Sequence, residues 1–390
     1  MKHTGERKIL IVAGETSGDL HGAHLVKAAL SLDPNLRFYG VGGDHLRNTG
    51  TEVIFDSSEV AVVGIVEVFS KLRSIYRAFR WLKRSLDRDR PSLAILIDFP
   101  DFNLKLAKEA NKRGIPVFYY ISPQVWAWRR GRVKKIAKLI PKLVVILPFE
   151  ASFYRERGVD CEFVGHPLVD IVKPHLPMEK AREIFRLDRD KRTLGLLPGS
   201  RREEVQRLLP VLLEGAQLLA RDFPDLQFII PLAPAINRVE VEEHIGRFNL
   251  DIRIVEEHIY DVLNICDLII TASGTATLEA TIMNTPMIIV YKVSFLSYLV
   301  GRLLVKVRNI GLVNLIAEKN IVPELIQGQA SPANVFNETS NMLKNPHLLS
   351  TIKGELEKVK EKLGNPGASR RAAQILYRFI HQEPLSPNSA

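Results

Sequence analysis

The strongest chemical signal in this sequence is a run of small and hydroxyl-bearing residues between an apolar strand and a helix. The run is Ser273, Gly274, Thr275, Ala276 and Thr277, and Glu279 follows it. Small side chains let a ligand approach the backbone, and the N–H groups at a helix start suit a diphosphate. Glu279 lies on the helix face of Thr275, where a carboxylate can accept hydrogen bonds from a ribose diol. The run predicts a nucleoside-diphosphate site, although an ordinary turn with hydroxyl caps uses the same residue types.

A second strand-to-helix turn provides a cation, in the run Leu197-Pro198-Gly199-Ser200-Arg201. Gly199 permits close approach of the backbone, and the planar guanidinium of Arg201 can bind two phosphate oxygens at once. A cation at a helix start is mildly unfavourable unless an anion lies nearby. We therefore expect Arg201 to bind the diphosphate.

Asp98 directly follows the apolar run Leu93–Ile97. In open α/β sheets, ligands bind at the carboxyl ends of the strands, so this carboxylate is well placed for chemistry. Phe99 beside it can desolvate the carboxyl group and raise its pKa toward the range of a general base. Asp101 is a rival carboxylate, and both acids could instead cap the helix that begins near Asn103. We expect Asp98 to be catalytic, with Phe99, Asp101 and Asn103 in the same cleft.

The first strand is followed by a polar turn, Gly14-Glu15-Thr16-Ser17-Gly18-Asp19. Its glycine spacing does not match the dinucleotide fingerprint, which argues against NAD. Two carboxylates and two hydroxyl groups could hold a hydroxyl-rich or phosphorylated ligand, and they exceed what a helix cap needs. We expect contacts to such a ligand from Glu15, Ser17, Gly18 and Asp19.

Two of the three tryptophans follow another predicted strand, in the run 121–129. Trp126 and Trp128 could pack in a core, or they could line a sugar or lipid cavity with Arg129 offered to a phosphate. His166 lies in the turn between the two halves of the chain. A lone histidine is usually structural, and we retain His166 only as an expected contact of the substrate cleft.

Strand-like and helix-like segments alternate along the whole chain. Short runs that are apolar throughout are typical of buried parallel strands. They span residues 8–13, 93–97, 117–121, 143–147, 193–197, 227–231, 252–255, 268–271 and 286–291. The pattern predicts two Rossmann-like α/β domains, residues 1–168 and 169–345, and a helical tail at residues 346–390. We expect a substrate cleft between the two domains.

The 390 residues carry a formal net charge of +10 and a pI near 9.5. This excess favours phosphorylated substrates or anionic lipid surfaces. We expect no nucleic-acid partner, because the sequence shows no base-stacking aromatic array and no named motif. Cys161 and Cys266 lack metal-ligand spacing and are expected to be free thiols in a reducing compartment. The sequence shows neither a signal peptide nor an apolar stretch of ~18 residues, so we expect a cytoplasmic location.

A basic amphipathic helix is predicted between Ile65 and Arg90. Such a helix can lie in an anionic lipid interface, although most apolar stripes pack on their own core. We expect membrane contact through Val66, Val68, Phe69, Leu72, Ile75, Tyr76 and Phe79. A second candidate, Phe295–Lys306, is left open.

The motifs around Gly14, Asp98, Trp126, His166, Arg201 and Ser273–Glu279 occur together and in this order. The ordered set resembles lipid-A-disaccharide synthases over nearly the whole chain. The resemblance implies the glycosyltransferase B fold, two Rossmann-like domains facing across a cleft, and an inverting transfer with no obligatory metal and no cofactor. The implied substrates are UDP-2,3-diacylglucosamine and 2,3-diacylglucosamine 1-phosphate. The implied products are the β(1→6) disaccharide 1-phosphate and UDP, in a step toward lipid A in Gram-negative bacteria.

The resemblance also implies roles for residues and partners. Asp98 would take the proton of the acceptor 6-hydroxyl, and Arg201 with the N–H groups of Gly274–Ala276 would stabilise the leaving UDP. Asn314 is implied as a UDP contact, in a segment where Val313 replaces a proline that the family often has. Acylated substrates imply a peripheral enzyme on the cytoplasmic face of the inner membrane. Exchange of the C-terminal segment between subunits, known in such relatives, would make a homodimer.

Two other functions remain open from the sequence. A UDP-N-acetylglucosamine 2-epimerase would use the same two-domain plan but would not need a basic lipid-facing helix. A non-catalytic binder of sugar nucleotides or lipids would bind both ligands without releasing UDP.

Overall fold

The computed structural model describes residues 6–60, 65–128, 130–294, 298 and 309–381, without the side chains of residues 65–72, 128 and 130. The chain divides into two compact units, Met1–Pro167 with Gly364–Ala390 and Leu168–Leu363. The C-terminal tail predicted at 346–390 is therefore shared between them. Helix α18 (Pro346–Lys362) belongs to the second unit, and α19 (Ala368–His381) belongs to the first.

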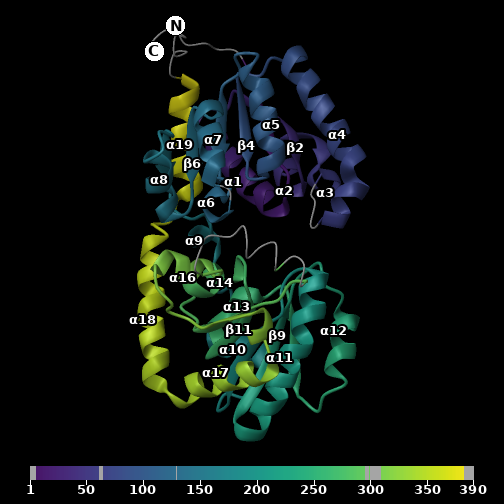
Figure 1. Ribbon diagram of the computed structural model, residues 1–390, viewed down its shortest axis with the longest axis vertical. Coiled ribbons are helices and arrows are strands. Elements are labelled where there is room, and N and C mark those ends of the chain that lie inside the picture. The colour runs from purple at the N-terminus through teal and green to yellow at the C-terminus, as the bar shows by residue number, and fades with distance from the viewer. Residues whose placement is uncertain (1–5, 61–64, 129, 295–297, 299–308, 382–390) are drawn as a thin grey trace. The chain divides into compact units, whose positions relative to one another are not determined.

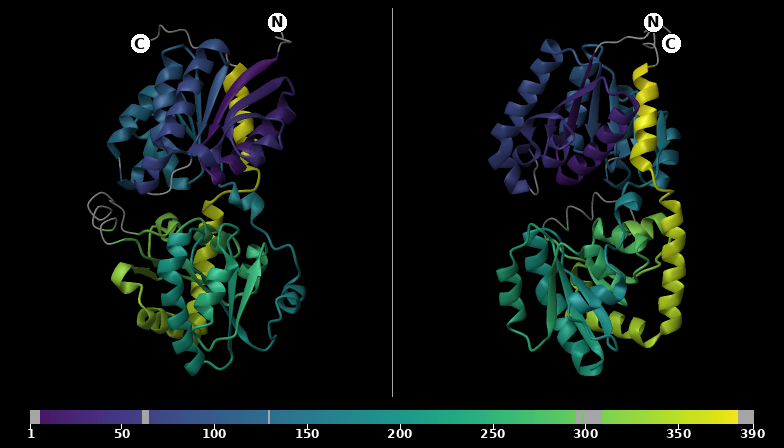
Figure 2. Two further views of the ribbon diagram at one scale, coloured as in Figure 1. Left: turned by 90° about the vertical axis from the view of Figure 1, so that its right-hand side faces the viewer. Right: turned by 180° about the vertical axis from the view of Figure 1, so that it is seen from behind.

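The first unit contains a seven-stranded parallel sheet in the order β3-β2-β1-β4-β5-β6-β7. Its strands are β1 (Arg7–Ala13), β2 (Leu36–Gly42), β3 (Glu52–Asp56), β4 (Leu93–Ile97), β5 (Val117–Tyr120), β6 (Lys142–Val145) and β7 (Cys161–Phe163). Its helices besides α19 are α1 (Thr16–Leu32), α2 (Asp44–Arg47), α3 (Ser57–Val60), α4 (Ile65–Arg88), α5 (Pro100–Asn111), α6 (Val125–Trp128), η1 (Arg130–Arg132), α7 (Val133–Leu139) and α8 (Pro148–Arg155). Helix α19 packs beside α1, so both ends of the chain contribute to this unit (Figures 1 and 2).

The second unit contains a six-stranded parallel sheet in the order β10-β9-β8-β11-β12-β13. Its strands are β8 (Arg192–Leu197), β9 (Leu226–Leu232), β10 (Ile252–Glu256), β11 (Leu268–Ala272), β12 (Met287–Tyr291) and β13 (Glu324–Ile326). Its helices besides α18 are α9 (Leu168–Ile171), α10 (Met178–Ile184), α11 (Arg202–Asp222), α12 (Arg238–Ile245), α13 (Ile259–Ile265), α14 (Ala276–Ile282), α16 (Leu312–Ala317), η2 (Gln327–Gln329) and α17 (Pro332–Lys344).

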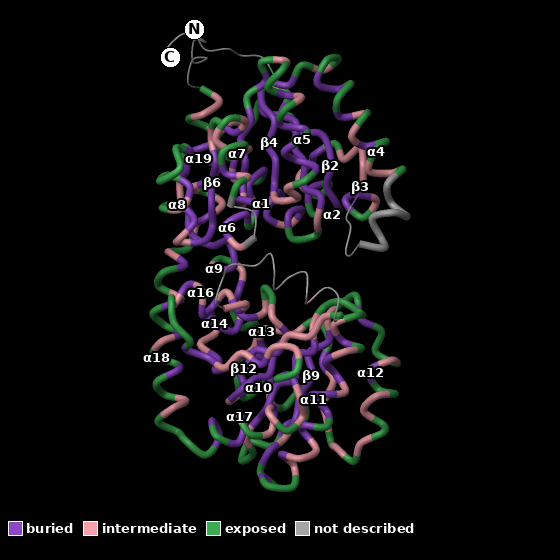
Figure 3. Tube along the Cα trace, in the orientation of Figure 1, coloured by how far each residue is buried: buried purple, intermediate pink, exposed green. Residues whose placement is uncertain are grey.

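The central strands of both sheets form the core of each unit. Every residue of β4 and of β11 is buried, as expected for parallel strands that are covered on both faces. Figure 3 shows buried strands inside each unit and exposed positions along the outer faces of α12 and α18. The predicted class, two parallel-sheet α/β domains, is confirmed. None of the helices in the described ranges combines the length and apolarity that a bilayer crossing requires.

Candidate active site

Two adjacent strands of the first unit end in backbone conformations that L-residues rarely adopt. Strands β4 and β5 pair in parallel, with Ile97 opposite Tyr120. Directly after them, Asp98 and Phe99 both have φ near 45°, and Ile121 has φ near 62°. Non-glycine residues in the left-handed region store strain, which tends to cluster at functional sites. The strain therefore marks the edge of the sheet at which the sequence places Asp98.

The backbone of Asp98 is held from three directions. Its N–H donates to the carbonyl oxygen of Tyr120 at 3.3 Å. Its carbonyl oxygen accepts from the Asn103 amide at 2.8 Å and from the Tyr119 hydroxyl. The same Asn103 amide group donates to the Ile97 carbonyl oxygen at 3.1 Å, and Asn103 is fully buried. Asn103 therefore stabilises the strained turn, and its expected place beside the acceptor stays a prediction.

The carboxyl group of Asp98 is poised to exchange a proton near neutral pH. Burial, the negative charge of Glu15 and, more weakly, that of Glu150 raise its pKa to about 7. A hydrogen bond from the Phe99 N–H acts in the opposite direction. A group with such a pKa is suited to general base catalysis, because both of its protonation states are populated at the working pH.

Phe99 forms a wall of this turn. Its ring stacks on Phe102 with centroids 5.1 Å apart, and Phe102 packs edge-on against Phe79 at 5.6 Å. A Cβ placed on Gly14 would lie 2.4 Å from Cδ1 of Phe99. The glycine at the end of β1 is therefore required by the aromatic ring that follows Asp98.

Two other carboxylates that the sequence places in the site, Asp101 and Asp19, have partners of their own. Asp101 is exposed and pairs with Arg132 at 2.5 Å, which leaves Asp98 as the acid in the desolvated position. Asp19 is buried, and its oxygens accept from the N–H groups of Gly43 at 2.6 Å, His45 at 3.0 Å and Leu46 at 3.2 Å. Asp19 thus orders the loop before α2, and its predicted contact with the acceptor is not supported by this placement.

The other residues of the first turn differ in accessibility. Glu15 is half-buried and Ser17 is exposed, whereas Gly18 is buried. A Cβ added to Gly18 would lie 3.5 Å from Cγ2 of Ile97. Glu15 and Ser17 therefore remain available to a ligand, whereas Gly18 serves the packing of α1 on β4.

Sequence reasoning missed Glu150, which organises the segment after β5. This fully buried carboxylate accepts from the Ser122 hydroxyl at 2.7 Å, the Trp126 indole at 2.9 Å and the Leu147 N–H at 3.1 Å. Burial raises the pKa of the Glu150 carboxyl group to about 7, although these hydrogen bonds act to lower it. Trp126 is buried and packs edge-on against Phe149, so it is a core residue rather than a cavity lining.

Three predicted contacts of the first unit remain, namely His166, Trp128 and Arg129. Burial and the neighbouring His21 lower the pKa of His166 to about 3, so His166 is buried and neutral at physiological pH. The side chain of Trp128 and the whole of Arg129 lie outside the described residues.

In the second unit, the predicted phosphate-binding turns follow adjacent strands. Leu197 of β8 lies opposite Thr271 of β11, so the turns that follow begin side by side. Gly199 has φ near 121°, and a Cβ there would lie 2.6 Å from Oε2 of Glu204. Arg201 is exposed, 3.5 Å from Oε1 of Glu204. Its guanidinium is free to exchange this long contact for an anionic ligand.

The turn after β11 has open space where a ligand would approach. A Cβ built on Gly274 meets no described atom within 4 Å, and its φ is not positive. The fold itself therefore does not require glycine at this position. Within the described chain, the N–H groups of Gly274, Thr275 and Ala276 have no recorded hydrogen-bond acceptor. These groups are therefore available to donate to a ligand, and the expected phosphate contact stays a prediction.

Two hydroxyl groups of this turn, those of Ser273 and Thr277, form hydrogen bonds within the fold. Thr277 is buried, and its Oγ1 donates to the Gly274 carbonyl oxygen at 2.8 Å. The Ser273 Oγ donates to the Ile310 carbonyl oxygen at 3.4 Å. The backbone N–H groups and the exposed side chain of Thr275 are thus the parts of the turn that remain available to a ligand.

Glu279 lies one helical turn further along α14. The Tyr260 hydroxyl donates to its Oε1 at 3.3 Å. Burial raises the pKa of the Glu279 carboxyl group, and the hydrogen bond from Tyr260 opposes that rise. Further lone-pair positions of the carboxylate remain open to a ligand diol.

Asn314 is fully engaged within its own loop. Its amide donates to the carbonyl oxygen of Val322 at 2.9 Å and to Glu324 at 2.8 Å, and its oxygen accepts from Ile321 at 2.8 Å and Val322 at 3.1 Å. Because two donors and two acceptor positions are all used, the side chain has none left for UDP. The predicted direct contact is thus corrected to a structural role. Glu324 also binds the N–H groups of residues 310 and 311 at 2.8 and 3.1 Å, which secures the loop against Ser273.

Known proteins show the family to which the chain belongs. A model of the family "Lipid-A-disaccharide synthetase" matches residues 9–379. The lipid-A-disaccharide synthase of Geobacter metallireducens is 48% identical over 374 residues, which cover 96% of this chain and 97% of the relative. That of Geobacter sulfurreducens is 47% identical over 383 residues, 98% of this chain and 100% of the relative. The chain belongs to the lipid-A-disaccharide synthetase family. Membership confirms the predicted enzyme class, a glycosyltransferase of lipid A biosynthesis.

Solved structures confirm the predicted glycosyltransferase B type of fold for this family member. The Staphylococcus aureus MnaA–UDP structure matches with a TM-score of 0.67 and 14% identity, over 98% of this chain and 100% of that chain. The UDP-GlcNAc 2-epimerase of Neisseria meningitidis, bound to UDP-GlcNAc, matches with a TM-score of 0.65 and 12% identity, over 95% and 100%. A glycosyltransferase from Rickettsia africae matches with a TM-score of 0.59 and 14% identity, over 98% and 100%. At such identity the likeness to epimerases concerns the fold alone.

The membrane helix expected in this synthetase is only partly described. The side chains of Val66, Val68, Phe69 and Leu72 lie outside the described residues. Ile75 and Phe79 are partly buried and pack against the core of the first unit, whereas Tyr76 is 62% exposed, so their predicted contact with lipid stays a prediction. The opposite face of the helix presents four exposed arginines, Arg73, Arg77, Arg80 and Arg84. The second candidate, Phe295–Lys306, lies almost wholly outside the described residues.

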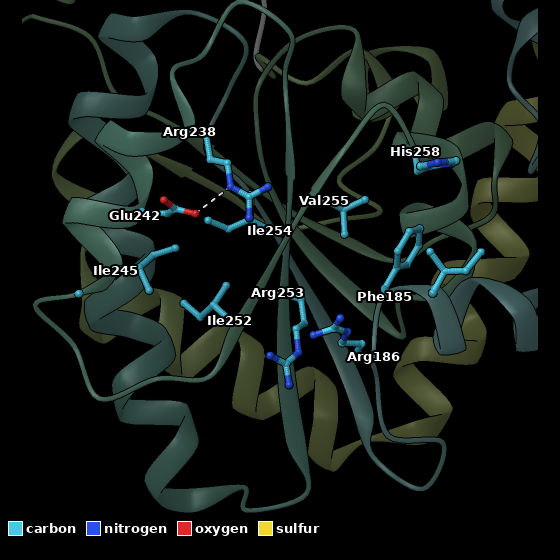
Figure 4. A pocket seen from close by; sticks show the side chains of 12 residues that line it. Phe185, Arg186, Arg238, Glu242, Ile245, Ile252, Arg253, Ile254, Val255 and His258 are labelled. Atoms are coloured by element: carbon cyan, nitrogen blue, oxygen red, sulfur yellow. Dashed lines mark hydrogen bonds and ion pairs between the residues drawn. The ribbon is translucent and has the colours of Figure 1, made fainter.

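A groove of about 590 Å³ lies elsewhere in the second unit, along the edge strand β10 (Figure 4). Arg238 pairs with Glu242 on its α12 side at 2.7 Å, and His258 lies at its other end. None of the residues predicted for the site lines this groove, so it is separate from the turns after β8 and β11.

Proposed function

We propose that this chain transfers 2,3-diacylglucosamine from UDP to the 6-hydroxyl group of 2,3-diacylglucosamine 1-phosphate. Family membership supports the acylated sugar substrates, and nucleotide-binding geometry after β8 and β11 supports the UDP carrier. The catalytic assignment rests on the strained turn at Asp98, whose backbone forms hydrogen bonds with Tyr119, Tyr120 and Asn103. The Asp98 carboxyl group in this turn has a pKa of about 7.

In this proposal Asp98 is the general base. It accepts the proton of the acceptor 6-hydroxyl group, whose oxygen forms a bond to the anomeric carbon of the donor. The attack comes from the face opposite the diphosphate, so the configuration at the anomeric carbon inverts. The bond between that carbon and the diphosphate oxygen breaks, and UDP leaves with the electron pair. Glu15 and Ser17, the accessible residues of the first turn, help to bind the acceptor.

The second unit stabilises the leaving group. Negative charge grows on the diphosphate as the bond breaks, and fixed N–H donors lower the barrier most when they point at such a charge. The backbone of Gly274–Ala276 and the guanidinium of Arg201 supply these donors, while Glu279 binds the ribose. No step in this scheme requires a metal ion.

UDP release in the presence of both acylated sugars tests the catalytic assignment. Asp98→Asn should lower kcat by about 10²–10⁴-fold, the usual contribution of a general base. Asp101→Asn is the matched control, and it should stay near the wild-type rate because Asp101 is exposed and paired with Arg132. A loss in the control with full activity in Asp98→Asn would transfer the role to Asp101. Binding of both sugars without UDP release by the wild type would favour a non-catalytic binder.

We further propose that the arginine face of α4 binds the anionic cytoplasmic surface of the inner membrane. Arg73, Arg77, Arg80 and Arg84 recur at helical spacing and are exposed, while the opposite face packs on the core. Each basic residue near an anionic bilayer contributes about 1 kcal/mol. Replacing Arg73 and Arg80 by Glu should therefore weaken sedimentation with phosphatidylglycerol vesicles by at least about tenfold. Equal binding by the variant, or equal binding to neutral phosphatidylcholine vesicles, would contradict the proposal.

A further inference from the structure

The first turn of α13 brings a tyrosine against the carboxylate assigned to the ribose. Tyr260 comes from α13 and Glu279 from α14, and the Tyr260 hydroxyl donates to Oε1 of Glu279 at 3.3 Å. Among the described residues, this is the one hydrogen bond recorded for the Glu279 side chain. The orientation of a largely enclosed carboxylate therefore depends on a single donor.

Tyr260 is itself anchored by its neighbour in sequence. Asp261 is fully buried, and its Oδ1 accepts from the N–H groups of His175 at 2.7 Å and Leu176 at 2.8 Å. Its Oδ2 lies 3.0 Å from Nδ1 of His258. These contacts fix the start of α13 to the segment before α10, and the Tyr260 ring lies beside the His175 ring with centroids 6.2 Å apart. The tyrosine is thus held in place before any ligand binds.

The arrangement has a consequence for recognition of the nucleotide. A carboxylate that accepts one hydrogen bond from Tyr260 keeps its other lone pairs for a diol, whereas a free carboxylate could rotate away from it. We propose that Tyr260 is a positioning residue that presents Glu279 to the ribose hydroxyl groups and so sets the preference for a ribonucleoside diphosphate. This inference rests on the proposed binding of UDP by the second unit.

Binding of UDP and of 2′,3′-dideoxy-UDP separates this role from a purely structural one. The ratio of the two dissociation constants, measured by titration calorimetry, reports the contribution of the ribose hydroxyl groups. We expect Tyr260→Phe to raise the Kd for UDP by about tenfold, the effect of one hydrogen bond to a charged group, and to leave the Kd for dideoxy-UDP unchanged. In steady-state assays the KM for the UDP-sugar should rise by a similar factor, with kcat nearly unchanged. Tyr377→Phe, which removes a hydroxyl group on α19, is the matched control and should behave as the wild type.

Glu279→Gln makes the outcomes distinguishable. If Glu279→Gln abolishes the preference for UDP and Tyr260→Phe does not reduce it, the positioning role is overturned while the proposed site stands. If Glu279→Gln keeps the full preference, Glu279 does not bind the ribose, and the proposed function loses that part of its site. Wild-type affinity for dideoxy-UDP in Tyr260→Phe verifies that the variant is folded. A general loss of affinity for both nucleotides would make Tyr260 a structural residue and overturn the inference.

Discussion

Gly274→Ala should weaken UDP binding without weakening the fold. A Cβ at Gly274 meets no described atom within 4 Å, and the residue lacks a positive φ. Alanine restricts the unfolded chain, so the free energy of unfolding should stay unchanged or rise by about 0.4–1 kcal/mol. The same methyl group would stand where a diphosphate must approach the backbone N–H groups. We expect the Kd for UDP to rise by about tenfold, which corresponds to about 1.4 kcal/mol, and to rise further in Gly274→Val.

Two other glycines serve as controls for this prediction. Gly354 lies in α18, where a Cβ also meets open space, so Gly354→Ala should stabilise the fold and leave UDP binding unchanged. Gly199→Ala should instead lower the free energy of unfolding by about 1–3 kcal/mol, because the φ of Gly199 is near 121° and Glu204 occupies the space that a Cβ would need. Calorimetric titration with UDP and thermal unfolding measure both quantities. A wild-type Kd for UDP in Gly274→Ala and Gly274→Val would refute the argument that this open space admits the diphosphate.

Three further predictions follow from the same structure. The kcat/KM of the wild type should fall as the pH drops below about 7, because the Asp98 base becomes protonated. Glu15→Gln should move this fall to lower pH, because the charge of Glu15 raises the pKa of Asp98. A pH–rate profile that is flat down to pH 5 would contradict the assignment of Asp98 as the base. Asn103→Ala should lower the free energy of unfolding by about 1–3 kcal/mol and also reduce kcat, since the Ile97 and Asp98 carbonyl groups each lose the Asn103 donor and Asp98 keeps only that of Tyr119; an unchanged kcat would show that the turn at Asp98 does not depend on Asn103. Asn314→Ala should cost about 3 kcal/mol in thermal or denaturant unfolding, and stability equal to the wild type would argue against the closed network around this amide.

The alternating architecture could be predicted from the sequence because its central strands are apolar on both faces. The run Leu93–Ile97 has the same bounds in the structure as in the prediction. Four strands were not recognised, namely β2, β3, β7 and β13. Strand β2 contains Gly40 and Gly42. A Cβ at Gly40 would lie 2.1 Å from the Ile11 carbonyl oxygen, so Gly40 reflects close pairing with β1, whereas a Cβ at Gly42 would lie 2.4 Å from Cδ1 of Leu46. Strands β7 and β13 have only three residues each, which is too short for a periodic pattern.

The site could be located from the sequence, but the task of each side chain could not. The position of Asp98 after an apolar strand pointed to a reactive edge, and the structure adds the left-handed backbone and its anchors. The polar turn after the first strand predicts a ligand contact for Asp19, and the family resemblance implies one for Asn314, yet both side chains bind backbone groups that folding brings close. Asp19 binds residues 24 to 27 positions away, and no local pattern reports such a contact.

Some of the missed residues had a readable signal and others had none. The run Leu147-Pro148-Phe149-Glu150 has proline at the first helical position and an acid two residues later, which is one half of a capping box, since the Glu150 carboxylate accepts from the N-cap N–H of Leu147. That pattern could have identified Glu150 as a residue that orders a helix start. Tyr260 and Glu279 lie on different helices, so only the folded chain reveals that they are hydrogen-bonded.

A crystal structure with bound UDP is the most direct test of the central claim that the second unit holds the nucleotide while the first supplies the base. The account predicts the diphosphate against the N–H groups of Gly274–Ala276 and the guanidinium of Arg201, and the ribose hydroxyl groups against Glu279. A diphosphate bound instead at the turn of Asp98 in the first unit would contradict it.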